Sequence, residues 1–84
     1  MINITNVKVI KTEDNYKVKG IASITIDDSF VVHDIKILES EKGLFVAMPS
    51  RRLPSGEFKD IAHPINAETR ELIQKAILSE YEKI

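Results

Sequence analysis

The sequence contains no cysteine, only three glycines and three prolines, and no long apolar run. Without cysteine the chain forms neither a disulfide framework nor a thiolate metal site, which fits an intracellular location. No segment approaches the roughly 20 apolar residues that span a bilayer, and the first residues lack the pattern of a secretory signal. We therefore expect a cytoplasmic protein that is not inserted in a membrane.

The chain also lacks an excess of charge of either sign. Twelve Lys and Arg residues stand against thirteen Asp and Glu, which gives a net charge of −1. The chain as a whole therefore has no basic field that would attract nucleic acid. The bases are unevenly distributed along the chain, however. The stretch from position 42 to position 59 contains one acid, Glu57, and four bases: Lys42, Arg51, Arg52 and Lys59. This basic island is the exception on an otherwise balanced surface.

The length of 84 residues allows one hydrophobic core. We therefore expect a single domain over residues 1–84. Hydrophobic residues make up 43% and charged residues 30%, which is ordinary for a folded protein. A chain this short leaves apolar surface uncovered, so a homodimer is the default expectation.

Alternating apolar residues predict antiparallel strands along the first half of the chain. The change of parity near Asn6 indicates a bulge in the first strand, and Gly20 marks a bend or a close approach of another backbone. The third strand is apolar on both faces, which indicates burial on both sides, under the helix or in a dimer interface. The expected strands are 2–11, 16–26, 30–38 and 44–48, and the expected turns are 13–15, 27–29 and 39–43.

The segment PSRRLPSG at positions 49–56 predicts an exposed loop, because it holds two prolines, a glycine and two serines. Residues 57–62 then predict a short fifth strand. A hairpin formed between this strand and residues 44–48 would hold Arg51 and Arg52 at one end of the sheet.

Asn66 is a suitable N-cap for a helix that begins at Ala67. Apolar residues at helical spacing, including Leu72, Ile73 and Ile77, give this helix one face for packing. The predicted fold class is α+β: an antiparallel meander of about five strands followed by a C-terminal amphipathic helix packed on the sheet.

The sequence offers little for catalysis. His33 and His63 are the only histidines, and pairing of His33 with Asp34 or of His63 with Asp60 is an alternative to a purely structural role. Two histidines and an aspartate could in principle hold a metal, but no metal-binding or nucleophile motif accompanies them. We expect no enzyme activity, no metal and no cofactor.

Two adjacent guanidinium groups can bind phosphate oxygens or a guanine edge. The alternative is that Arg51 and Arg52 only keep a loop solvated, and spacing alone favours that alternative. Arg70, Gln74 and Lys75 on the helix are similarly ambiguous, since an exposed helix face carries such residues in many proteins.

The amino-acid sequences of several segments resemble the stage V sporulation protein G family, also called the septation protein G family. The segments are IASITI at 21–26, FVVHDI at 30–35, GLFVAMPS at 43–50 and GEFKDIAHPIN at 56–66. The resemblance covers nearly the whole chain. This family commonly has Lys-Arg followed by Thr-Pro-Asp-Gly, where this chain has Arg51, Arg52, Leu53, Pro54, Ser55 and Gly56.

The resemblance implies a small bacterial regulator that forms a homodimer through its sheet, is linked to septum formation and sporulation, and binds DNA and RNA. It also implies nucleic-acid-binding roles for Arg51 and Arg52, and for Arg70, Gln74 and Lys75 on the helix. Two alternatives stay open at this point. One is a protein-interaction module of the division or sporulation machinery, and the other is a small metal-dependent hydrolase using His33 and His63.

Overall fold

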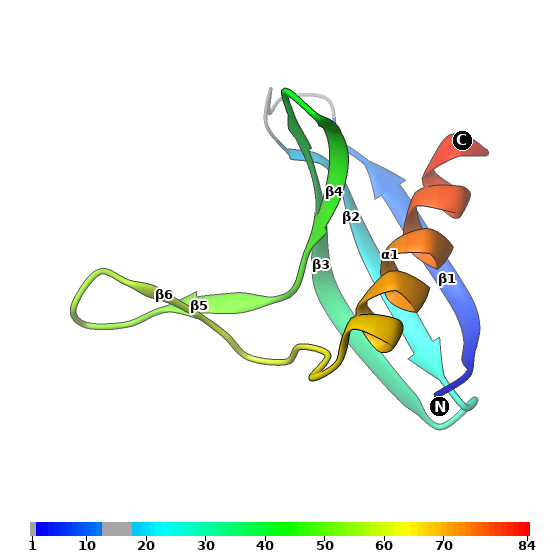
Figure 1. The fold of residues 1–84 in the computed structure, drawn as a ribbon, viewed down its shortest axis with the longest axis horizontal. Coiled ribbons are helices and arrows are strands. Elements are labelled where there is room, and N and C mark those ends of the chain that lie inside the picture. Colours follow the sequence, from blue (N-terminus) through cyan, green and yellow to red (C-terminus); the bar gives the residue numbers. More distant parts are fainter. Residues whose placement is uncertain (1, 13–17) are drawn as a thin grey trace.

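The computed structural model describes residues 2–12 and 18–84. It contains a sheet of four antiparallel strands in the order β1-β2-β3-β4, a two-stranded ribbon formed by β5 and β6, and a C-terminal helix, α1. Figure 1 shows α1 lying across one face of the larger sheet while the ribbon projects from it. The elements are β1 (Ile4–Lys11), β2 (Val18–Ile26), β3 (Phe30–Ser40), β4 (Gly43–Ala47), β5 (Ser50–Arg52), β6 (Phe58–Asp60) and α1 (Ala67–Glu82). The predicted α+β class is confirmed.

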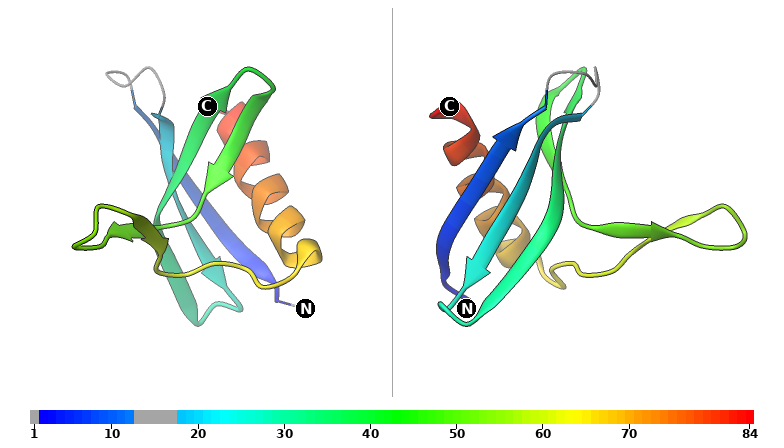
Figure 2. Two further views of the ribbon diagram at one scale, coloured as in Figure 1. Left: turned by 60° about the vertical axis from the view of Figure 1, so that its left-hand side comes forward. Right: turned by 180° about the vertical axis from the view of Figure 1, so that it is seen from behind.

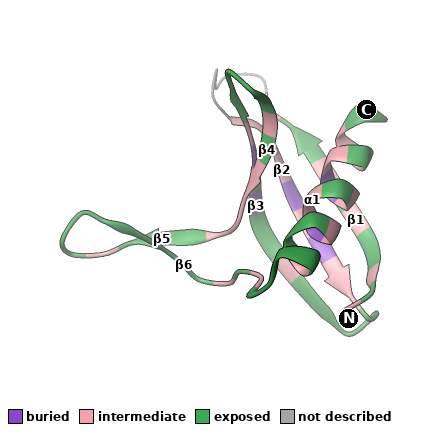
Figure 3. Cartoon of the chain, viewed as in Figure 1, coloured by how far each residue is buried: buried purple, intermediate pink, exposed green. Residues whose placement is uncertain are grey.

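The core lies between the sheet and α1. Its buried residues come from the middle strands and from one face of the helix, as the purple segments in Figure 3 show. They are Ala22, Ile24, Ile35, Ile37, Ile73 and Ile77. The helix packs against β1, β2 and β4, which leaves the opposite face of the sheet uncovered.

The helix begins as the sequence predicts. The Oδ1 atom of Asn66 accepts a hydrogen bond from the backbone N–H of Thr69 at 2.8 Å, which satisfies one of the free donors of the first turn. Gly20 is buried where α1 crosses the sheet. A Cβ atom at this position would lie 3.2 Å from the carbonyl oxygen of Ile10 and 3.4 Å from Cδ1 of Ile37, so the expected close approach of another backbone is confirmed.

Three register shifts interrupt the four-stranded sheet. The register shifts between Ile4 and Asn6 of β1, where the change in the alternation of apolar residues predicted a bulge. A second shift occurs where His33 and Asp34 of β3 lie opposite Ser23 of β2, and Asp34 has a φ of 60°. A third lies between Val18 and Gly20 of β2. The sequence analysis did not predict the bulge at Asp34.

The turn between β2 and β3 lies where the sequence predicted it. Asp27 and Asp28 both have positive φ, at 51° and 54°, and the N–H of Ser29 donates to the carbonyl of Ile26 at 3.0 Å. Residues 27–29 thus connect the paired Ile26 and Phe30, and aspartate is among the residues that tolerate the left-handed conformation such a turn needs. The predicted turn at 13–15 lies outside the described residues, as does the beginning of the predicted second strand at 16–17.

The sequence analysis predicted the wrong partner strand for the fifth strand. β4 pairs with β3 alone, while β6 pairs with β5, a short strand inside the segment predicted as a loop. Figure 2 shows the consequence from two further directions: β5 and β6 leave the sheet and form a separate projection. We call this projection, residues 49–61, the arm. No helix in the described part of the chain is both long and apolar enough to cross a membrane.

Candidate nucleic-acid interface

Arg51 and Arg52 lie on β5, on the arm. Arg51 is in register with Lys59 and Arg52 with Phe58. Side chains of register partners share one face of a ribbon, and neighbours along a strand point to opposite faces. The arm therefore has one face with Arg51 and Lys59 and another with Arg52 and Phe58.

Backbone hydrogen bonds hold the arm in shape. The N–H of Leu53 donates to the carbonyl of Glu57 at 2.7 Å, and the N–H of Gly56 donates to the carbonyl of Leu53 at 2.9 Å. Gly56 has a φ of 93°, a conformation that glycine adopts without strain. At the base of the arm the N–H of Ile61 donates to the carbonyl of Pro49 at 2.8 Å. The arginines thus sit on a closed β-ribbon and not on an irregular loop.

The cations of the arm are exposed and form no salt bridge with a carboxylate of residues 2–12 or 18–84. Arg51, Arg52 and Lys59 are all exposed to solvent. The salt bridge found in the described part of the chain joins Lys83 to Glu80 at the far end of α1. The guanidinium groups on the arm are therefore available to an external anion.

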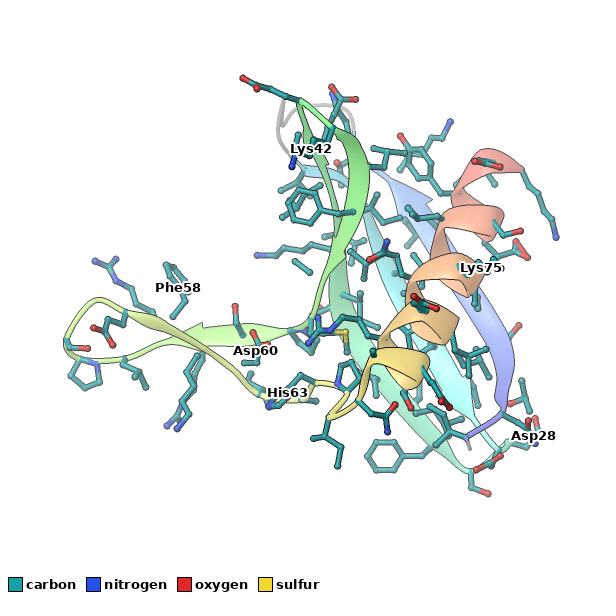
Figure 4. All side chains as sticks on the ribbon, in the orientation of Figure 1. Asp28, Lys42, Phe58, Asp60, His63 and Lys75 are labelled. Carbon is teal, nitrogen blue, oxygen red and sulfur yellow. The ribbon has the colours of Figure 1, made fainter. Side chains whose placement is uncertain are left out.

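The basic island of the sequence is divided in space. Figure 4 shows Lys42 at the turn between β3 and β4, whereas Phe58 and Asp60 mark the arm. Lys59 lies on β6 between those two arm residues. Sequence analysis counted Lys59 in the island but did not include it among the site residues, because the strand pairing that places it opposite Arg51 was not predicted.

The three helix residues line two depressions, and Gln74 lines both. Arg70 and Gln74 line a small depression with Met48 and Pro64 at the base of the arm. Lys75 lies one residue further around the helix, in a shallow depression that Gln74 also lines together with Glu71, Leu78 and Glu82. Arg70 and Lys75 are exposed and Gln74 is half-buried. The structure therefore places Arg70 next to the base of the arm and Lys75 away from it, with Gln74 between them.

The histidines do not gather with acids. Nδ1 of His33 lies 3.0 Å from Oγ of Ser23, across the bulge, and Nδ1 of His63 lies 3.0 Å from the carbonyl oxygen of Pro64. The hydrogen bonds of the described residues include neither the pairing of His33 with Asp34 nor that of His63 with Asp60. Across residues 2–12 and 18–84, no three His, Cys, Asp or Glu residues are grouped closely enough to hold a metal ion.

Taken together, the fold and the arm define a class: a small α+β protein in which a sheet-and-helix body carries a projecting, basic β-ribbon. The family model described as SpoVG matches residues 2–83, and the chain belongs to the SpoVG family.

Relatives in several bacteria support this assignment. The protein named "Putative septation protein SpoVG" from Clostridium perfringens strain 13 is 63% identical over 83 residues, which cover 99% of this chain and 92% of the relative. A protein with the same name from Clostridium kluyveri is also 63% identical, over 99% of this chain and 86% of its own length. The relative of that name from Caldanaerobacter subterraneus subsp. tengcongensis is 60% identical over 82 residues, 98% of this chain and 90% of its length. The resemblance found in the sequence is therefore confirmed.

Proposed function

We propose that this chain is a non-enzymatic regulator of septum formation and sporulation that acts as a homodimer by binding DNA and RNA. The link to septation rests on the family and on the names of the relatives. The observation that carries the nucleic-acid part is the arm, whose exposed cations Arg51, Arg52 and Lys59 project clear of the body.

The shape of the arm suits a nucleic-acid groove. A two-stranded β-ribbon fits the major groove of B-DNA, and arginine is the residue that most often reads guanine there. The same cations neutralise phosphates on RNA without a sequence requirement. A homodimer has two arms and so doubles the local positive charge, which is how a chain with a net charge of −1 holds a polyanion.

The experiment is an electrophoretic mobility shift series with DNA and RNA pools at several salt concentrations. The double variant Arg51→Ala/Arg52→Ala removes four cations from a dimer, so the slope of log affinity against log salt should become shallower by about 3 to 4. Affinity at low salt should fall by at least about 100-fold. The melting temperature should change little, because both side chains are exposed and outside the core.

The matched control is Lys8→Ala/Lys42→Ala. It removes the same charge from exposed positions on β1 and at the β3–β4 turn, away from the arm. This variant should keep most of the affinity. If both double variants bind equally well, or if both lose affinity equally, the arm is not the binding site.

A second candidate function has its own observation. The face of the sheet opposite α1 is uncovered and carries exposed Ile10, Val31 and Phe45, a surface suited to a protein partner of the division machinery. A partner captured from nuclease-treated lysate by wild type and by Arg51→Ala/Arg52→Ala, but not by Phe45→Ser, would support this function in place of nucleic-acid binding.

A further inference from the structure

The arm ends in a tight turn that backbone hydrogen bonds hold in one shape. Leu53 and Glu57 close the turn, since the N–H of Leu53 donates to the carbonyl of Glu57 at 2.7 Å. Inside it, the N–H of Gly56 donates to the carbonyl of Leu53 at 2.9 Å, and Gly56 has a φ of 93°. This pattern is typical of a hairpin whose three-residue loop ends on a left-handed glycine. The apex of the arm therefore consists of Pro54, Ser55 and Gly56.

Pro54 occupies the outer corner of this turn. Proline suits the second position of a β-turn, because its ring fixes φ near the value that this position requires. Pro54 is exposed, whereas the neighbouring Leu53 is half-buried although the arm projects from the body without a layer beneath it (Figure 1). Atoms of the arm itself therefore cover part of Leu53. The arm thus presents a stiff apolar ring at its apex, on a turn that is ordered in the free chain.

A cation lies beside this ring. Nη2 of Arg52 is 3.9 Å from the position that a Cβ atom on Gly56 would take, so the guanidinium group of Arg52 extends along the strand to the apex. Arg52 is exposed, and its donors can reach a phosphate or a base edge next to the group that the ring contacts. An apolar tip and a positive charge therefore share one end of the arm.

The arm is long enough to bring its apex to the floor of a DNA groove. Pro54 follows Pro49, at the base of the arm, by five residues. A strand rises about 3.3 Å per residue, so the apex lies roughly 15 Å from the base. The major groove of B-DNA is only about 8.5 Å deep. The apex can therefore touch base pairs while the body stays outside the phosphate backbone.

Apolar side chains that reach the base pairs, proline among them, act as wedges. They separate two stacked base pairs and kink the duplex by roughly 20–90°, and contacts to the phosphates offset the cost of unstacking. We propose that Pro54 is such a wedge, and that the chain kinks duplex DNA by inserting the apex of the arm between two adjacent base pairs. This inference rests on the proposed binding of DNA and adds to it a change in the shape of the DNA.

A wedge also gives a preference for certain base-pair steps without hydrogen bonds to the bases. Pyrimidine–purine steps such as TA unstack and kink easily, whereas runs of A are stiff. A duplex with a TA step at its centre should therefore bind more tightly than the same duplex with an AA step there. Contacts to phosphates alone would not distinguish the two duplexes.

The first test measures energy transfer between dyes at the two ends of a duplex of about 20 base pairs, at saturating protein. Wild type should bring the ends closer together. Pro54→Ser should bind the duplex and leave it nearly straight, because a short polar side chain does not separate base pairs. Pro54→Leu should keep the kink, because it restores an apolar side chain without the proline ring. Ser55→Ala, at the next position of the apex, should behave as wild type.

These variants also distinguish a wedge from a purely structural proline. An equal kink with wild type and Pro54→Ser would overturn the inference. So would loss of the kink in Pro54→Leu as well as in Pro54→Ser, because proline would then act only by shaping the turn. The melting temperatures should match that of wild type, since these positions are exposed and lie outside the core.

The second test places 2-aminopurine, whose fluorescence rises when the base unstacks, at the central step. Wild type should raise this fluorescence in the TA duplex and bind that duplex about 5- to 10-fold more tightly than the AA duplex. Pro54→Ser should abolish both effects, whereas Arg51→Ala/Arg52→Ala should lower the affinity for both duplexes. Affinity thus tests the proposed function, and the kink and the step preference test the wedge. Equal, unkinked binding of both duplexes by wild type would overturn the inference and leave nucleic-acid binding by the arm standing.

Discussion

Arg51 and Lys59 are register partners in the β5–β6 ladder, so the ribbon places two like charges on one face. Like charges directly opposite each other destabilise a ladder by a few tenths of a kcal/mol up to about 1 kcal/mol. A phosphate bound between them removes that repulsion and gains two charge-assisted contacts. The pairing thus gives the arm a preference for anions that neither residue would have alone.

Lys59→Ala tests the role of this pair. The variant removes one cation from each arm, so the salt dependence of nucleic-acid affinity should become shallower by about 2 in slope for a dimer. Lys42→Ala removes the same charge from the β3–β4 turn, which lies away from the arm, and should leave the slope unchanged. Equal effects in filter-binding titrations of the two variants would show that only the total charge matters.

The sequence predicted the body of the fold well, because each element there follows from local patterns. The alternation in β2, the aspartate turn and the Asn66 cap all lie where the sequence placed them. These features depend on neighbouring residues only, and local rules describe them fully.

The arm and the bulge in β3 could not be predicted in this way. Val32 and Ile35 have opposite parity, yet both face α1, because the extra residue at Asp34 shifts the alternation. The sequence analysis interpreted that parity as burial on both faces. In the same way, the proline-rich segment at 49–56 indicated a loop, although Arg51 and Arg52 pair across to β6. Both features depend on which residues of separate strands become partners. Local patterns in a single sequence do not reveal that pairing.

Asn66→Ala should destabilise the protein by about 1 kcal/mol, since the side chain of Asn66 caps the first turn of α1. Urea unfolding at one fixed protein concentration measures the change, and the fixed concentration is needed because association of the chains in the proposed homodimer would add to apparent stability. Asn66→Asp keeps a cap acceptor and should lie close to wild type. A loss as large in Asn66→Asp as in Asn66→Ala would mean that the cap is not the cause.

Substitutions at Gly20 should destabilise the fold in proportion to side-chain size. A Cβ atom there meets the Ile10 carbonyl oxygen at 3.2 Å and the Ile37 side chain at 3.4 Å, and overpacking of this kind typically costs about 1–3 kcal/mol. Gly20→Ala should therefore be less stable than wild type in thermal unfolding, and Gly20→Val less stable still. Wild-type stability in Gly20→Val would show that β1 and β3 are not packed around Gly20 as closely as described.

Substitutions at Arg70 and Lys75 test whether α1 contributes a contact at a particular position to nucleic-acid binding or only positive charge. Arg70 borders the base of the arm beside Met48 and Pro64, so we expect a nucleic acid that binds the arm to contact its guanidinium group as well. Lys75 shares its depression with the acids Glu71 and Glu82, which reduce its attraction for a polyanion. Arg70→Ala should weaken binding in mobility shifts about 5- to 10-fold, in the range of one charged contact, and Lys75→Ala should have little effect. If Lys75→Ala is the more damaging of the two, the nucleic acid crosses the outer face of α1, and the arm does not set its path.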